Sequence, residues 1–172
     1  MNNGSEHDVA DETSWEQWLA RHTPALLLFA RQQADGETDA QDLVQEAVVA
    51  SWQRHSGGVP PPLGVVYAMI RHRAIDWARR NGRRTNREAA VHLDGPECWL
   101  DAGVDERERS QLIQKALSTL PDIYREVLTL KVWGGLTFGE IAEALDIPAN
   151  TAASRYRYGL QELRKATREV LA

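Results

Sequence analysis

The segment TFGEIAEALDIPANTAASRYRYGL, residues 137–160, has the spacing of two short helices joined by a tight turn. Thr137 and Glu140 have the spacing of a capping box, which fixes where the first helix begins. Asp146 lies where such a turn often needs a left-handed backbone, a conformation that Gly adopts freely and Asp adopts at some cost. Pro148 prevents the first helix from continuing, and Asn150 is the expected N-cap of the second. The spacing predicts a helix-turn-helix.

The second helix of this motif has an apolar side and a polar side. The apolar side carries Ala152, Tyr156, Leu160 and Leu163, and the polar side carries Thr151, Ser154, Arg155, Tyr158, Glu162 and Lys165. In a helix of this kind that docks on DNA, residues near the N-terminus reach base edges and basic residues further along meet phosphates. We favour DNA binding over a plain amphipathic bundle helix, because the capping box, the small residue Ala142, the turn and the N-cap occur at the required spacing.

The rest of the chain predicts an all-α fold of two small helical domains joined by a flexible acidic linker. Helical periodicity runs through residues 14–90 and resumes in residues 106–172, and strand alternation is absent. Residues 91–105 contain Gly, Pro and four acids without periodicity, and residues 1–13 form an acidic extension. A chain of 172 residues can bury one modest core or two small ones.

Helix boundaries in the first domain follow from local signals. Starts are expected at Ser14 with Gln17, at Thr23 with Pro24, and at Thr38 with Gln41. Beyond the third start, the positions Ala40, Leu43, Val44, Ala47, Val48, Ser51 and Trp52 follow helical spacing and indicate a core face. Asp42, Gln45, Glu46, Val49 and Gln53 fall on another face, which periodicity leaves open as a solvated surface or a partner surface.

An arginine-rich helix follows a rigid loop. The loop, HSGGVPPPLG at residues 55–64, contains two glycines and three consecutive prolines, which cannot continue a helix. Residues 65–80 return to helical spacing, with Val66, Tyr67, Ile70, Ala74 and Trp77 as expected core contacts. Seven arginines and one acid lie between residues 71 and 87, although the net charge of the chain is -5. That total argues against a protein that simply coats nucleic acid.

Enzymatic and membrane functions have little support in the sequence. The five histidines show no metal-ligand spacing, no phosphate-binding loop is present, and the lone Cys98 has no evident base partner. We therefore expect no catalysis, no cofactor and no metal. A single cysteine, an acidic N-terminus and the lack of an apolar run approaching ~20 residues favour a protein that stays in the cytoplasm, without a membrane partner.

Three segments together resemble the extracytoplasmic-function sigma factors, the small two-domain members of the bacterial sigma-70 family. They are DAQDLVQEAVVASW at residues 39–52, VYAMIRHRAIDWARR at residues 66–80, and ALSTLPDIYREVLTLKVWGGLTFGEIAEALDIPANTAASRYR at residues 116–157. Their order and spacing make the resemblance specific. It implies a non-enzymatic protein that binds core RNA polymerase, at the β′ clamp helices and the β flap, and directs it to promoter DNA.

The resemblance also implies residue roles. The polymerase surface is Asp39, Asp42, Leu43, Gln45 and Glu46; the minus-10 contacts are Arg71, His72, Arg73, Asp76, Arg79 and Arg80; the minus-35 contacts are Thr151, Ala153, Ser154, Arg155, Arg157 and Tyr158. The loop at residues 55–64 would form a pocket for an unstacked base. His72 and Ala153 depart from the residues that are commoner in the family, Asn and a basic side chain.

Two questions stay open from the sequence. The alternative function is a helix-turn-helix regulator that binds an operator as a dimer, with the first domain as a sensor or dimerisation module. The face from Asp39 to Glu46 and the arginine helix discriminate against it, because a regulator needs neither. Whether an anti-sigma factor is a further partner is not decided by the sequence.

Overall fold

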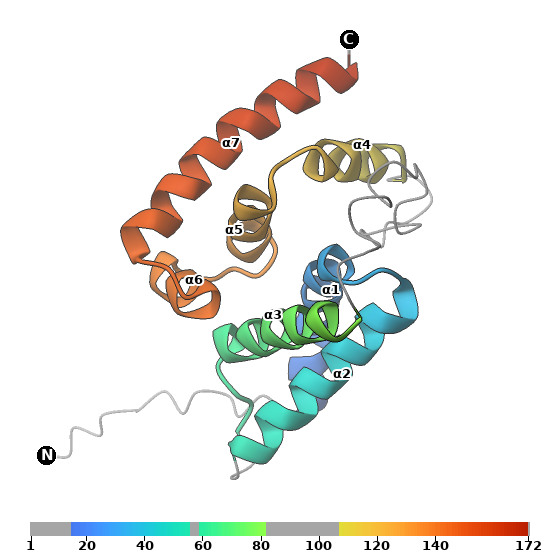
Figure 1. Cartoon of the computed structure of the whole chain (residues 1–172), viewed down its shortest axis with the longest axis vertical. Helices are drawn as coiled ribbons and strands as arrows, with labels where there is room; N and C mark the ends of the chain where they lie inside the picture. Colours follow the sequence, from blue (N-terminus) through green and yellow to red (C-terminus); the bar gives the residue numbers. More distant parts are fainter. Residues whose placement is uncertain (1–14, 56–58, 82–106, 172) are drawn as a thin grey trace, which may run out of the picture.

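The structure, a computed structural model, describes residues 15–55, 59–81 and 107–171. Within these residues all regular secondary structure is α-helical (Figure 1). The helices are α1 (Trp15–Gln33), α2 (Glu37–Arg54), α3 (Leu63–Arg80), α4 (Arg107–Ser118), α5 (Asp122–Val132), α6 (Phe138–Leu145) and α7 (Ala149–Leu171). The expected all-α class is confirmed, whereas the extension 1–13 and the linker 91–105 lie outside the described residues.

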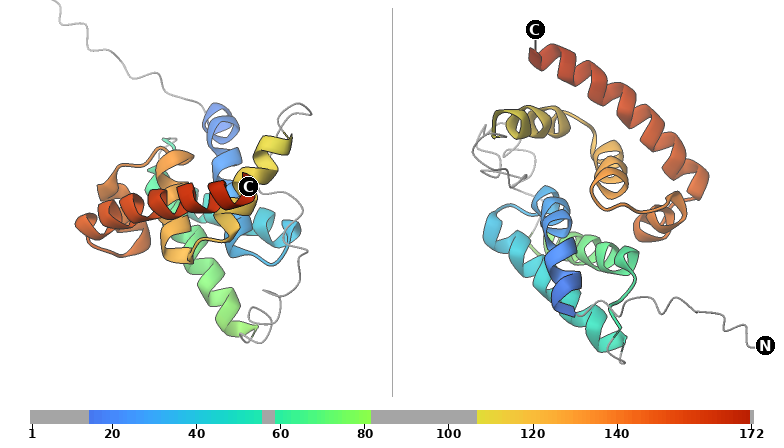
Figure 2. Two further views of the ribbon diagram at one scale, coloured as in Figure 1. Left: turned by 90° about the horizontal axis from the view of Figure 1, so that it is seen from above. Right: turned by 180° about the vertical axis from the view of Figure 1, so that it is seen from behind.

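The helices form two groups along the chain. In the first group, α1, α2 and α3 pack on one another in every pairwise combination. In the second group, α7 packs against α4, α5 and α6. Figure 2 shows α7 as a long helix that runs across this second group and ends at the outer edge of the molecule. The two predicted helical blocks therefore both form.

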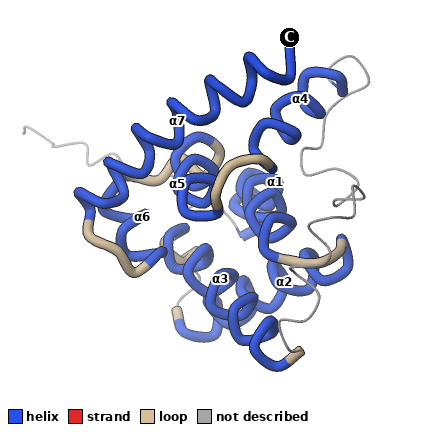
Figure 3. The backbone as a smooth tube through the Cα atoms, turned by 45° about the horizontal axis from the view of Figure 1, so that its top comes forward, coloured by secondary structure: helices blue, strands red, loops and turns tan. Residues whose placement is uncertain are grey.

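The two groups share one hydrophobic core, which the sequence did not predict. α6 packs on α3 and α5 packs on α1, so the helix-turn-helix lies directly on the first group (Figure 3). The main core cluster joins Phe29 and Tyr67 of the first group to Leu130, Ile141 and Ala152 of the second. A smaller cluster in the second group also includes Leu28 of α1. The chain buries apolar surface between its two groups as well as within each.

The predicted helix break at Thr23 and Pro24 is wrong. Both residues lie inside α1, which runs without interruption from Trp15 to Gln33. Proline inside a helix removes one backbone hydrogen bond and crowds the preceding turn. Here Trp18 lies before the proline and Phe29 after it, and both are buried in the same core cluster, so tertiary packing holds both halves in one helix.

The predicted capping box of Thr38 and Gln41 is also wrong. The N-cap of α2 is Gly36, two residues before Thr38, with an extended backbone and no side-chain cap, and the helix begins at Glu37. Arg31 at the end of α1 explains the start, because its Nε and Nη2 atoms donate to the Glu37 carboxylate at 2.8 and 2.9 Å. These hydrogen bonds hold the pKa of Glu37 below its usual value. The predicted capping box of Ser14 and Gln17 stays a prediction, because Ser14 lies outside the described residues.

The boundaries of the helix-turn-helix follow the sequence more closely. Thr137 accepts from the Glu140 backbone N–H at 3.2 Å, and the Glu140 carboxylate accepts from the Thr137 backbone N–H at 2.7 Å, so the capping box is confirmed. Asp146 has φ 55°, as the left-handed turn requires. Asn150 is not the N-cap, because α7 begins at Ala149 and its first helical bond runs from Ala152 N–H to the Pro148 carbonyl.

Two tryptophans expected to face the core are exposed instead. Trp52 is 55% exposed and Trp77 is 37% exposed, whereas the other expected core residues of α3 are buried. Trp52 lies in the last turn of α2, where its ring contacts Trp15 edge-on at 6.4 Å. Trp77 lies near the end of α3, where it lines a groove described below. Helical spacing predicted the core-facing side correctly for most positions. It did not predict that side chains near the helix ends are less buried.

Candidate functional site

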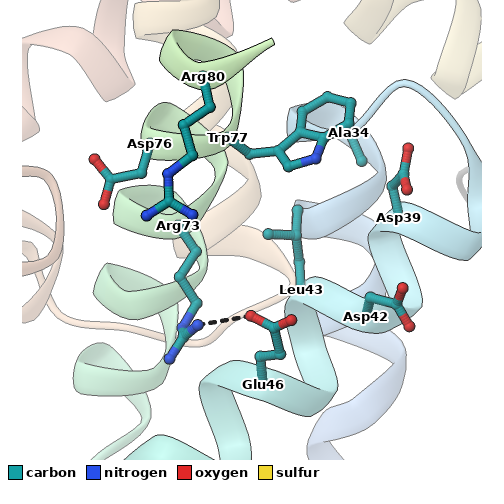
Figure 4. A pocket seen from close by; sticks show the side chains of 9 residues that line it. All are labelled: Ala34, Asp39, Asp42, Leu43, Glu46, Arg73, Asp76, Trp77 and Arg80. Carbon is teal, nitrogen blue, oxygen red and sulfur yellow. Dashed lines mark hydrogen bonds and ion pairs between the residues drawn. The ribbon is translucent and has the colours of Figure 1, made fainter.

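A groove of about 240 Å³ separates α2 from α3 (Figure 4). It is lined by Ala34, Asp39, Asp42, Leu43, Glu46, Arg73, Asp76, Trp77 and Arg80. The structure thus brings together four of the five residues predicted to bind the polymerase and three of the six predicted to contact the minus-10 element. The fifth polymerase residue, Gln45, is exposed on α2 and does not line the groove.

An ion pair crosses this groove. Arg73 Nη1 of α3 lies 2.6 Å from Glu46 Oε2 of α2, and Figure 4 draws this contact between the two helices. Leu43 and Trp77 add apolar surface beside it. The α2 wall of the groove therefore carries carboxylates that can bind a basic partner, and the α3 wall carries two guanidinium groups, which can bind phosphates, beside the carboxylate of Asp76.

The remaining minus-10 candidates lie outside the groove. His72 and Arg79 are exposed on α3, and Arg79 lies 3.9 Å from Asp76. Arg71 is directed to the second group of helices, where its Nε donates to Glu126 of α5 at 3.2 Å. The predicted minus-10 surface is thus divided between a groove edge, an exposed helix face and a contact with α5.

Glu126 is a functional candidate that sequence reasoning missed. Its side chain is 11% exposed and accepts hydrogen bonds from Arg71 and from Gln33 of α1 at 3.0 Å. Nearby on α5, Thr129 exchanges a hydrogen bond with Gln32 of α1 at 3.0 Å. The only local signal is an acid placed among the apolar residues of α5, and its partners are 55 and 93 positions away along the chain.

The predicted minus-35 residues share one helix but differ in exposure. Ser154, Arg157 and Tyr158 are exposed, whereas Thr151, Ala153 and Arg155 are half-buried. Arg157 stacks on the ring of Tyr158 at 5.0 Å. On the opposite side, Ala152 is fully buried and Tyr156, Leu160 and Leu163 pack on the core, as their spacing predicts. The exposed polar side of α7 can therefore face a DNA groove.

Burial and hydrogen bonding shift two pKa values around these helices. The capping hydrogen bonds from Thr137, with the backbone donor first, hold the pKa of Glu140 below its usual value. Burial raises the pKa of Tyr67, whose hydroxyl is buried without a hydrogen-bond partner. The Tyr67 ring contacts Phe29 of α1 edge-on at 5.4 Å, so this tyrosine is part of the core beneath α3.

Comparison with known families assigns both groups of helices. Residues 18–84, which include most of α1 and all of α2 and α3, match the family model for sigma-70 region 2. Residues 110–163, which include the helix-turn-helix, match the model for sigma-70 region 4. The two regions occur in this order and together cover most of the chain. The chain belongs to the sigma-70 family of RNA polymerase sigma factors.

The individual relatives that the chain matches are also named as RNA polymerase sigma factors. The chain is 28% identical to the RNA polymerase sigma-E factor of Streptomyces avermitilis over 154 residues, which covers 88% of this chain and 83% of the relative. It is 29% identical to the ECF RNA polymerase sigma factor SigK of Mycolicibacterium vanbaalenii over 136 residues, covering 73% of this chain and 67% of the relative.

Solved structures agree on the fold. The sigma factor RpoE of Bartonella quintana, determined in complex with the anti-sigma factor NepR, superposes with a TM-score of 0.69 at 22% identity, covering 90% of this chain and 96% of that chain. CnrH, determined with the cytosolic domain of CnrY, gives a TM-score of 0.56 at 23% identity, covering 87% and 84%. None of the described helices of the present chain is long and apolar enough to cross a membrane.

Proposed function

We propose that this protein binds core RNA polymerase and directs it to promoters that carry a minus-10 and a minus-35 element. The observation that carries the proposal is the match of regions 2 and 4, in order, to the helices that hold the groove and the helix-turn-helix. The family acts by regulation, and we infer that this chain has no catalytic activity of its own and works in the cytoplasm, where its polymerase is.

The polymerase contact is assigned to the acidic wall of the groove. Asp42, Gln45 and Glu46 are exposed on one side of α2, with Asp39 and Leu43 half-buried beside them. Carboxylates at this density suit a basic partner surface, such as a helix that carries arginines. The assignment of this wall to the β′ clamp helices follows from the family resemblance.

The minus-10 contact is assigned to α3. His72, Arg79 and Arg80 are exposed along this helix, and Arg73 can reach DNA when it leaves Glu46. Arginine surfaces can hold the backbone of a displaced strand, which helps to offset the cost of extruding a base. The loop before α3 is the proposed base pocket, and residues 56–58 of that loop lie outside the described residues.

The minus-35 contact is assigned to the exposed side of α7. Ser154 and Arg157 are exposed there and can donate hydrogen bonds to base edges or phosphates. Ala153 provides no donor, so sequence discrimination should depend on Ser154, Arg155, Arg157 and Tyr158 and on DNA shape. An anti-sigma factor is proposed as a further partner, because the sigma factor RpoE of Bartonella quintana was solved in complex with the anti-sigma factor NepR.

Transcription by purified core polymerase tests the proposal. Core enzyme with the protein should give transcripts with defined 5′ ends, and core enzyme alone should not. The double variant Asp42→Arg/Glu46→Arg should lose polymerase binding, because it places like charges against a basic surface. If core enzyme is no more selective with the wild-type protein than without it, the proposal fails.

The same variant discriminates the alternative function, a regulator that binds an operator as a dimer. Under that alternative, the double variant should keep its DNA binding and need no polymerase. The matched control is Glu108→Arg/Glu169→Arg, which makes the same change in net charge at exposed positions of α4 and α7. The control should keep polymerase binding, so a loss in both variants would point to net charge and not to the α2 surface.

A further inference from the structure

One arginine of the helix-turn-helix is held by an aromatic ring and not by an acid. The guanidinium carbon of Arg157 lies 5.0 Å from the centroid of the Tyr158 ring. In the part of the chain that the structure describes, Arg157 forms no ion pair with an acid. The arginines of α3 differ, because Arg71, Arg73 and Arg79 each lie within 4 Å of a carboxylate, at 3.2, 2.6 and 3.9 Å.

Ring stacking and ion pairing leave different donors on a guanidinium group. A carboxylate accepts hydrogen bonds from the N–H groups along the edge, so an ion pair occupies those donors. A ring contacts the flat face and leaves the edge accessible. The bond from Arg157 Nη2 to the Tyr158 hydroxyl is 3.4 Å long, which is weaker than the usual contact of about 2.7–3.2 Å. Arg157 is therefore oriented while most of its five N–H donors stay available to a ligand.

The backbone beside this pair is fixed by a close helix contact. Gly159, the next residue, is buried where α7 packs against α5. A Cβ atom at this position would lie 3.1 Å from Leu128 Cδ1 and 3.2 Å from Tyr124 Cβ, both on α5. Only a residue without a side chain allows this approach without a shift of those neighbours. The stacked pair is thus carried on a helix surface that is held in place from behind.

The pair lies on the side of α7 that is proposed to face DNA. Arg157 and Tyr158 follow Ser154 by three and four positions, so all three share one helix face, and all three are exposed. The Tyr158 side chain is 47% exposed. Side chains on a helix lean toward its N-terminus, which is the end from which a docked recognition helix reaches base edges.

We propose that Tyr158 is a positioning residue, which holds Arg157 for bidentate recognition of a guanine in the minus-35 element. This inference rests on the proposed function, and it has Tyr158 act through Arg157 in place of a base contact of its own. Two N–H donors of one guanidinium edge must meet O6 and N7 of guanine in the base plane. An arginine that is already stacked loses less side-chain freedom on binding than an unsupported one.

Transcription from a promoter library tests this base preference. The full-length protein is combined with core polymerase and with promoters randomised in the minus-35 element, and the transcripts are sequenced. The wild type should favour guanine at one position about tenfold, and Arg157→Ala should abolish that preference. Tyr158→Leu should reduce it at least about threefold, whereas Tyr158→Phe should keep it, because the ring remains. Preferences at the other positions should not change.

A double variant separates positioning from a direct contact. If Tyr158 acts only through Arg157, Arg157→Ala/Tyr158→Leu should match Arg157→Ala within about twofold. Gln161→Leu is the matched control, because it places a leucine at an exposed position of the same helix without changing the charge, and it should match the wild type. A further loss in the double variant, loss of the preference in Tyr158→Phe, or an equal loss at every minus-35 position would each overturn the proposal.

The stack can also be measured without DNA or polymerase. In the NMR spectrum of the free full-length chain, the Tyr158 ring current should shift the Arg157 Hδ signals upfield. Tyr158→Phe should keep that shift and Tyr158→Leu should remove it, so equal positions of these signals in all three proteins would contradict the stack. Start sites separate the two levels of the argument. If the wild type gives no defined start sites with core polymerase, the proposed function fails and the inference fails with it. Defined start sites without a guanine preference that depends on Arg157 would overturn the inference alone.

Discussion

The α2–α3 hairpin and the helix-turn-helix of α6 and α7 both present charged side chains, but they hold them in different ways. In the hairpin, Arg73 pairs with Glu46 across two helices, and Arg71 pairs with Glu126, 55 positions along the chain. In the helix-turn-helix, Glu140 pairs with Thr137 in its own capping box. The pairs formed by Arg73 and Arg71 are therefore long-range, whereas the Thr137–Glu140 pair is local.

This difference has a consequence for how each region responds to change. A local contact stabilises its own helix, and its loss should affect mainly that helix. A contact between distant segments depends on how the two groups of helices dock, so its loss should also affect the other group. We therefore compare the loss of unfolding free energy for three kinds of contact: the shared core, a local helix cap and an ion pair between two helices.

The largest expected effect comes from the shared core. Leu130→Ala should lower the free energy of unfolding by about 2–5 kcal/mol, because it leaves a cavity where the two groups meet. Leu130 is fully buried there. Urea unfolding followed by tryptophan fluorescence and by circular dichroism measures the loss. The two signals should shift together in the variant, since one core cluster contains residues of both groups.

The matched control lies two residues further along the same helix. Val132 is exposed, and Val132→Ala should change the free energy of unfolding by less than about 0.5 kcal/mol. If Leu130→Ala shifted only one of the two signals, the two groups would unfold independently. The contrast between long-range and local contacts would then not extend to the core.

A smaller effect is expected at the cap of α6. Thr137→Ala should cost about 1 kcal/mol, because it removes the acceptor of an N-terminal helix N–H group. Thr38 provides the control, since it is exposed and α2 begins without a side-chain cap. Thermal unfolding should show a lower midpoint for Thr137→Ala and no change for Thr38→Ala. Equal losses would mean that the two threonines act in the same way.

The cap also predicts a pH dependence with a definite sign. The pKa of Glu140 is lowered in the folded state, so its contribution to stability is present above its unfolded pKa and is lost as the pH falls through the folded pKa. Thr137→Ala keeps the backbone N–H and removes only the hydroxyl's share of this effect, so the difference in unfolding free energy between wild type and variant should be largest at neutral pH and shrink below about pH 4. A difference that grew with acidification would contradict this assignment.

The two regions also differ in how far the sequence predicts them. The capping box at Thr137 and the left-handed Asp146 are local events, and spacing alone predicts both. The starts at Thr23 and Thr38 carry equally good local signals, yet the packing around Phe29 and the pairing of Arg31 with Glu37 override them. Local capping signals decide a helix end only where no core packing or ion pair competes with them.

The candidate site shows the same limit. Family resemblance places acids on α2 and arginines on α3, and periodicity leaves both sets of side chains outside the core. Neither can show that Arg73 reaches Glu46, or that Arg71 is instead directed to Glu126 of α5. Those contacts depend on helix docking, which involves residues 27 and 55 positions apart. The sequence predicts that these charged side chains are present on α2 and α3. It does not predict which arginine pairs with which acid.

The smallest expected effect is the coupling within the hairpin ion pair. A double-mutant cycle with Glu46→Gln and Arg73→Gln, measured by urea unfolding, should give about 0.2–1 kcal/mol. The side chains are 59% and 38% exposed, so water screens the pair and added salt should weaken it further.

The cycle of Glu126→Gln and Arg71→Gln is the comparison, because those side chains are only 11% and 25% exposed. Its coupling should be larger and less sensitive to salt, since burial reduces screening. Equal couplings would mean that the contact with α5 is no more than a surface ion pair, and Glu126 would then have no special part in holding the two groups together.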